Sequence, residues 1–285
     1  MNGIILIDKP KEYTSHDVVA IIKKISKEKV GHTGTLDPNA SGVLPLLIGK
    51  ATGISKYLIN HDKTYIATLK LGIKTDTADG EGNIIEEKEV SKISEEVVIN
   101  VLNSIIGKQS QVPPMYSAIK VNGKKLYEYA RQGKTVEVKG RDIDIYDMKL
   151  LELNLKEGEV IFEISCSKGT YIRTVCENVA EKLNTVGYMK ELRRVKVGEF
   201  NIQDSIKIED VKNNGNLLEE KIITIEKFFK SKEKLDLSDK ELQLFLNGVM
   251  ITKQNIDEIY RIYNNNVFIG LGLINNNRLK RDIII

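Results

Sequence analysis

Apolar and polar positions change their period along the chain, and each period predicts a different element. Residues 4–7 form a short apolar run stopped by an aspartate, which predicts a first strand. The apolar residues within 18–25 recur at helical spacing and predict a helix that Ser15 caps. Residues 31–45, GHTGTLDPNASGVLP, are too polar and too rich in glycine and proline for a core element, and they predict an ordered loop.

The same analysis predicts strands and helices along the rest of the chain. Up to residue 132 they are a strand at 64–73, a turn-rich loop at 75–83, a helix at 94–106 and a short helix at 125–132. A β-hairpin of 143–154 with 159–166, a helix after 169–170 and a strand at 191–200 follow. The last predicted elements are helices with a connector at 205–235 and a short helix with short strands from about 236.

Composition narrows the class of protein. The chain has 285 residues, of which 41% are hydrophobic, so it is long enough for one large domain or for one large and one small domain. Its two cysteines, Cys166 and Cys176, form no CxxC pair, and the three histidines are scattered, so neither a disulfide framework nor a zinc site is expected. The apolar run at 4–7 is too short for a signal peptide, and no run approaches a membrane span, so we expect a cytoplasmic protein without membrane contact.

Charge is concentrated in one segment. The chain as a whole carries a net charge of +3, which decides little. Residues 120–141, KVNGKKLYEYARQGKTVEVKGR, carry seven basic and two acidic residues, a net charge of +5, with tyrosines among them. Any lysine-rich protein has basic runs, but a local excess of this kind with interleaved aromatic residues is typical of a nucleic-acid surface. Lys124, Lys125 and Arg131 are the candidate phosphate contacts.

Asp37 is the most constrained polar residue of the opening loop. The following Pro38 pushes its backbone out of the helical region, and the nearby glycines allow backbone conformations that other residues resist. The loop therefore displays one carboxylate in a fixed direction. Aspartate before proline also serves as a local turn cap, which would be a structural role. The segment lacks the residues of a phosphate loop, of a Ca²⁺ loop and of a paired-carboxylate glycosidase site.

Several separated segments resemble one known family. The stretch GHTGTLDPNASGVLPLLIGKAT closely resembles the catalytic motif of the bacterial TruB-type tRNA pseudouridine synthases. The other similar segments are DKPKEYTS at 8–15, DKTYIATLKLGIKTDTADGEG at 62–82, VPPMYSAIKVNGKKLYEYARQG at 112–133, GTYIRTV at 169–175 and LRRVKVGEF at 192–200. The resemblance runs from residue 3 to about residue 200. Residues 236–285 are only broadly similar to the small β-barrel RNA-binding domain of the PUA type.

The resemblance implies a fold. It predicts an α/β (α+β) catalytic domain over residues 1–230, built on a mixed, largely antiparallel sheet with flanking helices. It also implies a tRNA-gripping insertion at about 112–141 and a PUA-like RNA-binding domain at 236–285.

The resemblance further implies a reaction. Uridine at position 55 in the T-arm loop of tRNA is isomerised to pseudouridine: the bond from C1′ to N1 breaks and C5 bonds to C1′. Nothing is oxidised and no group is added, so no cofactor and no metal are implied. Asp37 is the essential carboxylate in this resemblance. It attacks C1′, removes the C2′ proton or adds to C6, and these three routes stay open.

Two residues complete the implied catalytic group. Arg173 is similar to the arginine that pairs with this aspartate, and Tyr65 to the tyrosine that stacks on the target base and helps to remove the C5 proton. Taken alone, Arg173 would be read as a surface ion pair worth at most about 1 kcal/mol. A tyrosine in an alternating strand, like Tyr65, is usually a core residue.

Four further residues are implied to bind the substrate. Leu192 closes the pocket, Tyr171 lies in the same segment as the arginine, Lys9 supports the catalytic loop, and His32 helps to occupy the space left by the uridine when it swings out. Taken alone, these would be core, solvated or loop residues. The chain departs from the family pattern at Glu12, where members often carry glycine.

Two other functions are compatible with parts of this sequence. An RNA-binding or tRNA-folding module with secondary catalysis would not need the set of Asp37, Tyr65 and Arg173. A guide-RNA-dependent relative would not need the insertion at 112–141, which lets a protein grip tRNA unaided. We therefore expect a monomer that acts on the T arm of tRNA without an obligatory protein partner or guide RNA.

Overall fold

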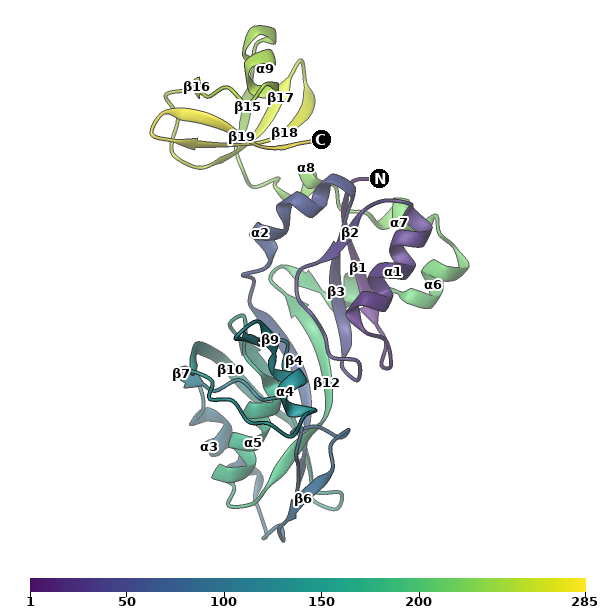
Figure 1. Ribbon diagram of the computed structural model, residues 1–285, viewed down its shortest axis with the longest axis vertical. Helices are drawn as coiled ribbons and strands as arrows, with labels where there is room; N and C mark the ends of the chain where they lie inside the picture. Colours follow the sequence, from purple (N-terminus) through teal and green to yellow (C-terminus); the bar gives the residue numbers. More distant parts are fainter. The chain divides into compact units, whose positions relative to one another are not determined.

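The computed structural model describes all residues from 1 to 285, and the chain forms two compact units (Figure 1). The first unit contains Met1–Asp37, Leu44–Ile59 and Asp204–Ile285. The second contains Pro38–Val43 and Asn60–Gln203. The first unit therefore contains both ends of the chain, and most of the second unit is one continuous segment between them.

Four strands and the helices packed on them form the N-terminal part of the first unit. Strand β1 (Gly3–Lys9) lies between β14 (Ile206–Lys207), with which it is parallel, and β3 (Ser41–Ile48), which also pairs with β2 (Val30–His32). The helices of this N-terminal part are α1 (Ser15–Ser26), α2 (Ser55–Leu58), α6 (Ile208–Asn213), α7 (Leu217–Lys221) and α8 (Ile225–Phe228), with a 3-10 helix, η1 (Gly49–Ile54). Apolar side chains from β1, β3, α1 and α6 meet in one buried cluster that holds the sheet and helices together.

Helix α1 begins one residue earlier than predicted. Its N-cap is Thr14, whose hydroxyl accepts from the backbone N–H of Asp17 at 3.0 Å, while the Asp17 carboxylate accepts from the backbone N–H of Thr14 at 2.8 Å. The prediction that Ser15 caps the helix was wrong because two neighbouring hydroxyl residues compete for the position, and only Thr14 has an acid three residues later to complete a capping box. Ser15 is left for another contact.

The segment 31–45 is only partly a loop. Strand β3 already begins at Ser41, and Val43 and Leu44 are fully buried. The expectation of a loop up to residue 45 was wrong because Pro45 and Gly42 conceal the start of an apolar strand, SGVLPLLI. Proline lacks one backbone donor, but the strand pairs with β2 directly after it, from Leu46 to Ile48.

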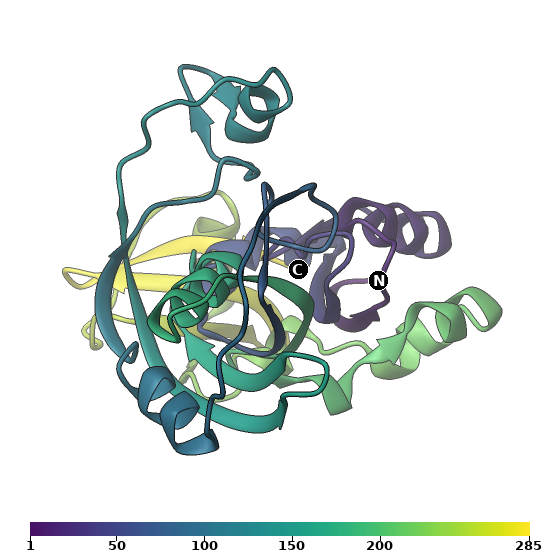
Figure 2. The same cartoon turned by 90° about the horizontal axis from the view of Figure 1, so that it is seen from below.

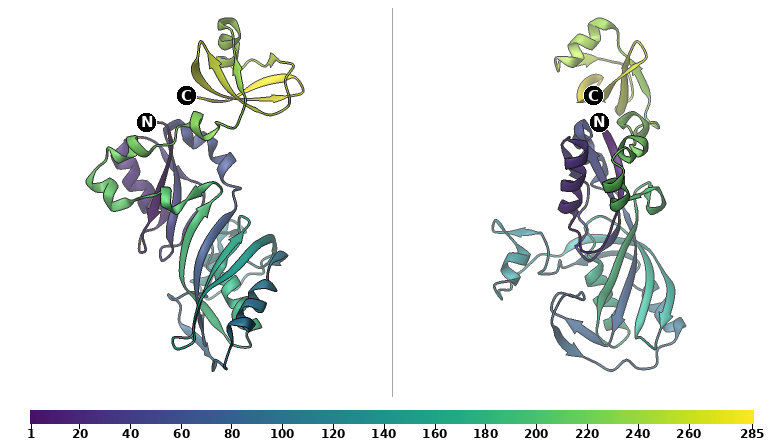
Figure 3. Two further views of the ribbon diagram at one scale, coloured as in Figure 1. Left: turned by 180° about the vertical axis from the view of Figure 1, so that it is seen from behind. Right: turned by 90° about the vertical axis from the view of Figure 1, so that its right-hand side faces the viewer.

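The C-terminal part of the first unit is a curled five-stranded sheet (Figure 3). Its strands lie in the order β15-β17-β18-β19-β16 and pack on helix α9 (Asp239–Leu246) around the buried ring of Phe245. Their bounds are β15 (Lys234–Asp236), β16 (Ile251–Thr252), β17 (Ile259–Asn264), β18 (Val267–Asn275) and β19 (Arg278–Ile284). The prediction of a short helix and short strands here is confirmed, and the domain boundary at 236 stays a prediction.

Pairs of asparagines make the turns of this curled sheet. Asn265 and Asn266 join β17 to β18 with φ of 49° and 64°, and Asn276 and Asn277 join β18 to β19 with φ of 51° and 58°. Two successive residues with positive φ form the turn that fits the twist of a two-residue hairpin, and asparagine tolerates this conformation better than most residues.

The second unit is built on a long mixed sheet. Its strands follow the order β3-β12-β4-β11-β10-β7, and β13 pairs with β12; β3 and β12 are parallel, and the other pairs are antiparallel. The bounds are β4 (Lys63–Leu71), β7 (Gly107–Gln111), β10 (Arg141–Asn154), β11 (Glu159–Cys166), β12 (Gly187–Val197) and β13 (Phe200–Asn201). Helices α3 (Glu95–Asn103) and α5 (Ile172–Lys182) pack on this sheet. The predicted mixed, largely antiparallel α/β fold is confirmed.

Smaller elements of the second unit include some that were not predicted. Hairpin β5 (Ile73–Thr75) with β6 (Ile84–Glu87) frames the turn-rich loop, and β7 follows α3. The basic segment forms a second small hairpin, β8 (Lys120–Val121) with β9 (Lys124–Lys125), before α4 (Leu126–Ala130). A short 3-10 helix, η2 (Ile202–Asp204), follows β13. None of the helices is both long and apolar enough to span a bilayer.

Two glycines with similar backbone angles provide a test of the contact between β3 and β12. Gly42 has φ of 115°, and a Cβ there would lie 2.1 Å from the carbonyl oxygen of Arg194; Gly107 has φ of 117° and nothing within 4 Å. Both alanine variants bear the cost of a positive φ, about 1–2 kcal/mol, but only Gly42→Ala adds overpacking of about 1–3 kcal/mol. We expect Gly42→Ala to lower the free energy of unfolding more than Gly107→Ala in urea titrations followed by circular dichroism. Equal losses would contradict this close approach.

Candidate active site

Asp37 is an exposed residue, whereas the residue before it is buried and held by hydrogen bonds. Leu36 is buried, and both of its backbone polar groups bind the side chain of Ser15, which is 1% exposed. The Ser15 hydroxyl accepts from the Leu36 N–H at 2.9 Å and donates to the Leu36 carbonyl at 3.1 Å. A hydroxyl is one of the few groups that both donate and accept, so one side chain at the start of α1 fixes this point of the loop. The following Pro38 restricts the backbone of Asp37 from the other side.

Lys9 holds the turn that follows β1. Its ammonium group is fully buried and donates to the carbonyls of Pro10 at 2.8 Å and of Tyr13 at 2.6 Å. Within this turn Glu12 has φ of 69°, the left-handed conformation that favours glycine. The departure from the family pattern at Glu12 is therefore accommodated with backbone strain, and Lys9 fastens the turn from inside.

His32 ends strand β2 beside another histidine. Its ring centroid lies 5.5 Å from that of His16 in an edge-on arrangement. The contact joins the beginning of the 31–45 segment to helix α1, the helix that also carries Ser15.

In the second unit, Arg173 lies in the first turn of α5 and is 7% exposed. Its guanidinium donates to the carbonyl of Thr77 at 3.2 Å, to the Asp79 carboxylate at 3.2 Å and to the carbonyl of Tyr116 at 2.8 Å. Asp79 was not singled out from the sequence, although it lies in the acidic loop TDTADGEG. The pairing of Arg173 with Asp37 stays a prediction.

Tyr65 and Leu192 come from adjacent strands of the same sheet. They are 9% and 8% exposed, on β4 and β12 respectively. Arg194 lies directly across from Tyr65 in the register of these strands and hydrogen-bonds to its side chain. A shift in register between Arg194 and Lys196 marks a bulge in β12, which lets Arg194 be fully buried while Lys196 is exposed.

The buried guanidinium of Arg194 was missed in the sequence. Its Nε donates to the carbonyl of Val43 at 2.9 Å. Burial lowers the pKa of Arg194 and the neighbouring Tyr65 acts against this; an arginine nevertheless stays charged in a protein. The only sequence signal was the pair Arg193-Arg194 inside a strand, where neighbouring side chains point to opposite faces.

The basic segment projects from the rest of the second unit (Figure 2). An Asn122-Gly123 turn, with φ of 50° and 81°, closes the β8–β9 hairpin and places Lys124 and Lys125 just after it. The ring of Tyr127 has the Lys125 ammonium 5.3 Å and the Arg131 guanidinium 5.4 Å from its centroid. Lys124 and Arg131 are exposed and Lys125 is half-buried, and two of the three predicted phosphate contacts, Lys125 and Arg131, lie over the same tyrosine ring.

Tyr171 is the N-cap residue of α5 and is half-buried. Its backbone N–H and C=O are both bound by the side-chain amide of Gln111, a residue that was not singled out from the sequence. The structure thus brings Tyr171 and Arg173 together at the start of one helix.

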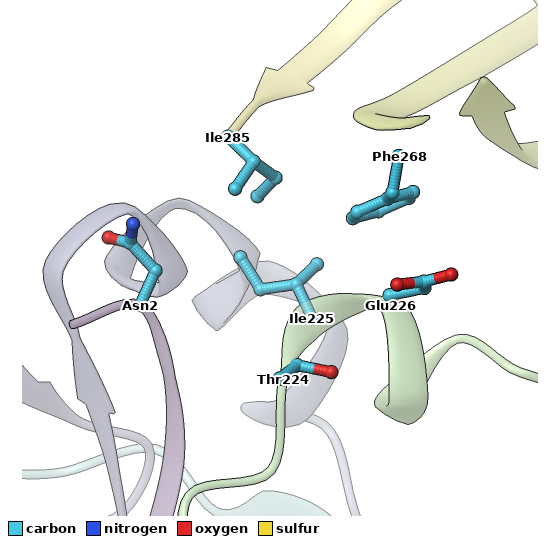
Figure 4. A pocket seen from close by; sticks show the side chains of 6 residues that line it. All are labelled: Asn2, Thr224, Ile225, Glu226, Phe268 and Ile285. Carbon is cyan, nitrogen blue, oxygen red and sulfur yellow. The ribbon is translucent and has the colours of Figure 1, made fainter. Parts of the chain in front are cut away.

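Two other features contain none of the predicted site residues. A pocket of about 320 Å³ in the first unit is lined by Asn2, Thr224, Ile225, Glu226, Phe268 and Ile285, and its apolar side chains face one another (Figure 4). The cysteines are buried, and burial raises the pKa of Cys166 to about 11 and also raises the pKa of Cys176. Thiols in this state are poor nucleophiles.

Three models of one protein family match consecutive parts of the chain between residues 23 and 281. The "TruB family pseudouridylate synthase (N terminal domain)" matches residues 23–172, the "tRNA pseudouridylate synthase B C-terminal domain" matches 173–234, and "Pseudouridine synthase II TruB, C-terminal" matches 234–281.

Solved structures are similar over nearly the whole chain. A chain of a Cbf5-Nop10-Gar1 complex aligns with a TM-score of 0.69 and 25% identity, covering 99% of this chain and 83% of that one. A chain of an H/ACA RNP bound to a substrate RNA containing 2′-deoxyuridine aligns with a TM-score of 0.68 at 24% identity, covering 99% and 83%, which supports the fold.

Sequence relatives are closer. The tRNA pseudouridine synthase B of Clostridium tetani is 47% identical over 279 residues, with 95% of each chain covered. Those of Clostridium perfringens and Clostridium novyi are each 44% identical, over 281 residues with 95% of each chain covered and over 288 residues with 98% of each chain covered. The chain therefore belongs to the TruB family of tRNA pseudouridine synthases, which are isomerases.

Proposed function

We propose that this enzyme isomerises uridine 55 in the T-arm loop of tRNA and that Asp37 is its essential carboxylate. The observation that carries the proposal is an exposed carboxylate on a backbone whose preceding residue is held at both polar groups by Ser15. Attack at C1′, proton removal at C2′ and addition at C6 all need an ionised carboxylate in a fixed place. A prearranged group avoids the entropy cost of orienting it during the reaction.

Tyr65 and Leu192 form the surface against which the uracil ring packs in this proposal. The aromatic face of Tyr65 suits a planar base, and after C5 has bonded to C1′ its hydroxyl relays the C5 proton, accepting that proton while it passes on its own. Arg194 keeps that hydroxyl in one orientation through its hydrogen bond from the opposite strand. The proton lost from C5 is balanced by the one gained at N1, so no redox partner is required.

Arg173 supplies the positive charge near the reacting nucleoside. Its three partners, Thr77, Asp79 and Tyr116, fix the guanidinium, and we propose that it orients the Asp37 carboxylate by a charge-assisted hydrogen bond. In this arrangement Asp79 is the charged one of the three partners that keep Arg173 in place.

Base flipping needs a source of binding energy, because unstacking the uridine costs a few kcal/mol. Lys124, Lys125 and Arg131 contact phosphates and release counterions, while His32 helps to fill the vacated space. The Cbf5 chain of similar fold is found in complex with Nop10 and Gar1. We propose that the present enzyme acts as a monomer without a guide RNA, because its own insertion provides the cations that hold the tRNA.

Replacing Asp37 by asparagine tests the catalytic carboxylate. Asp37→Asn keeps the size of the side chain but removes its charge, so we expect tritium release from C5-labelled uridine in tRNA to fall by about 10⁴-fold or more. The Kd for tRNA, measured by gel mobility, should change less than about threefold. Unchanged turnover would remove Asp37 from the mechanism and favour an RNA-folding module instead.

Replacing Ser15 tests whether the loop must be held. Ser15→Ala leaves the Leu36 N–H and C=O without their buried partner, at a cost of about 1–3 kcal/mol. We expect turnover to fall about tenfold with an unchanged Kd for tRNA. Ser26→Ala is the matched control, since Ser26 is on the same helix and only accepts from the Glu28 N–H at 3.3 Å. Equal rates for both variants would count against the clamp.

Removing charge from the insertion tests the RNA surface. In the triple variant Lys124→Gln, Lys125→Gln and Arg131→Gln, we expect the Kd for tRNA to rise by about 10- to 100-fold near 0.1 M salt. The slope of log Kd against log salt should fall by about 2–3 because up to three phosphate contacts are lost.

The matched control removes three exposed lysines from other parts of the same unit, as Lys88→Gln, Lys92→Gln and Lys156→Gln. Its salt dependence should stay close to that of the parent enzyme. Identical slopes for the two triple variants would mean that the insertion makes no special contribution to RNA binding.

A further inference from the structure

The side chain of Gln111 binds a segment sixty residues away. Its Oε1 accepts from the Tyr171 N–H at 2.8 Å and its Nε2 donates to the Tyr171 carbonyl at 3.1 Å. Gln111 is 5% exposed, so this pair of bonds is largely shielded from water. The amide thus satisfies both backbone groups of one residue, in the way that a neighbouring strand would.

Gln111 lies at the root of the RNA-gripping insertion. It is the last residue of β7, directly before the insertion at 112–141, and its backbone pairs with Arg141, where the insertion ends. Both ends of the insertion therefore meet at Gln111. On the other side of the contact, Tyr171 precedes Arg173 by two residues.

A second contact joins the same two segments. The guanidinium of Arg173 donates to the carbonyl of Tyr116, which lies in the first residues of the insertion, at 2.8 Å. The root of the insertion is thus fastened to the start of α5 at two points, of which one is Arg173 itself.

We propose that Gln111 is a positioning residue that ties the placement of Arg173 to the placement of the insertion. The inference rests on the proposed roles of Arg173 and of the insertion. Tension on the insertion from bound RNA passes through Gln111 to Tyr171 and from there to the first turn of α5. The enzyme thereby aligns its guanidinium when tRNA occupies the insertion.

The chemistry of the contact requires a neutral amide of this length. A glutamate at position 111 would accept from the Tyr171 N–H but would face its carbonyl oxygen with a second acceptor, which is repulsive. A methionine has similar length and offers neither bond, so it leaves two buried backbone groups unsatisfied.

The strand carries its own control. Gln109 lies two residues earlier in β7, and its Nε2 donates to the Ile105 carbonyl at 2.8 Å, a contact within the neighbouring turn. Gln109→Met therefore removes a side-chain hydrogen bond of the same kind from the same strand without touching α5.

The experiment measures single-turnover tritium release at saturating tRNA together with the Kd for tRNA. For Gln111→Met and Gln111→Glu we expect the rate to fall by about 10- to 100-fold while the Kd stays within about threefold. Gln109→Met should keep the parent rate. Parent-like rates for both Gln111 variants, or an equal fall in Gln109→Met, would overturn the proposal.

A double-mutant cycle separates positioning from a general loss of structure. Arg173→Lys keeps the charge but loses the forked donors, so it should be slow by itself. If Gln111 acts through Arg173, Gln111→Met should slow the Arg173→Lys enzyme by less than about twofold further. Multiplicative losses would overturn the proposal.

The cycle also separates this proposal from the one on which it rests. A slow Arg173→Lys enzyme combined with a normal Gln111→Met enzyme would overturn the role of Gln111 alone. A normal rate for Arg173→Lys would remove Arg173 from the mechanism and the positioning role with it.

Discussion

A buried guanidinium has to be supplied with acceptors, and this requirement organises the second unit. Arg173 and Arg194 are 7% and 1% exposed, and burial of a charge without partners would cost far more than a folded protein has to spare. Their acceptors come largely from backbone carbonyls of loops and strand ends, namely those of Thr77, Tyr116 and Val43. The hydrogen bonds of these two arginine side chains thereby hold the segments around Thr77, Tyr116 and Val43 in place.

The first unit also uses buried polar side chains to hold its main chain, one neutral and one charged. Ser15 uses one hydroxyl to hold both backbone groups of Leu36, and Lys9 closes its turn with two carbonyls. Ser15 binds the main chain of the residue next to Asp37, whereas Lys9 binds the main chain of its own turn. With the neighbouring backbone held, the Asp37 carboxylate can move only by rotation about its own side-chain torsions.

The sequence predicted most of the elements but little of what holds the proposed site in place. Local periodicity predicted α1, β4, α5 and the β10–β11 hairpin because each buries one face and leaves a pattern of period 3.6 or 2. The partnership of Arg173 with Asp79 spans 94 residues, and no local pattern encodes a contact of that range. The same holds for Gln111 and Tyr171. The start of β3 was mistaken for loop because Gly42 and Pro45 interrupt its apolar run, although the close approach to Arg194 is what requires a glycine there. The two turns made by asparagine pairs in the curled sheet could have been predicted from the sequence, since two-residue turns with positive φ favour this residue.

The meeting of the two ends of the insertion at the Gln111–Arg141 pair bears on how the family can diverge. Because its two ends are paired with each other, the segment between them behaves as a closed loop whose entropy cost grows only with the logarithm of its length. Doubling such a loop costs roughly 0.6 kcal/mol, less than many single core substitutions. Natural variation beyond Tyr116 can therefore lengthen, shorten or change the charge of the insertion, while the contacts of Arg173 with Thr77, Asp79 and Tyr116 stay in place.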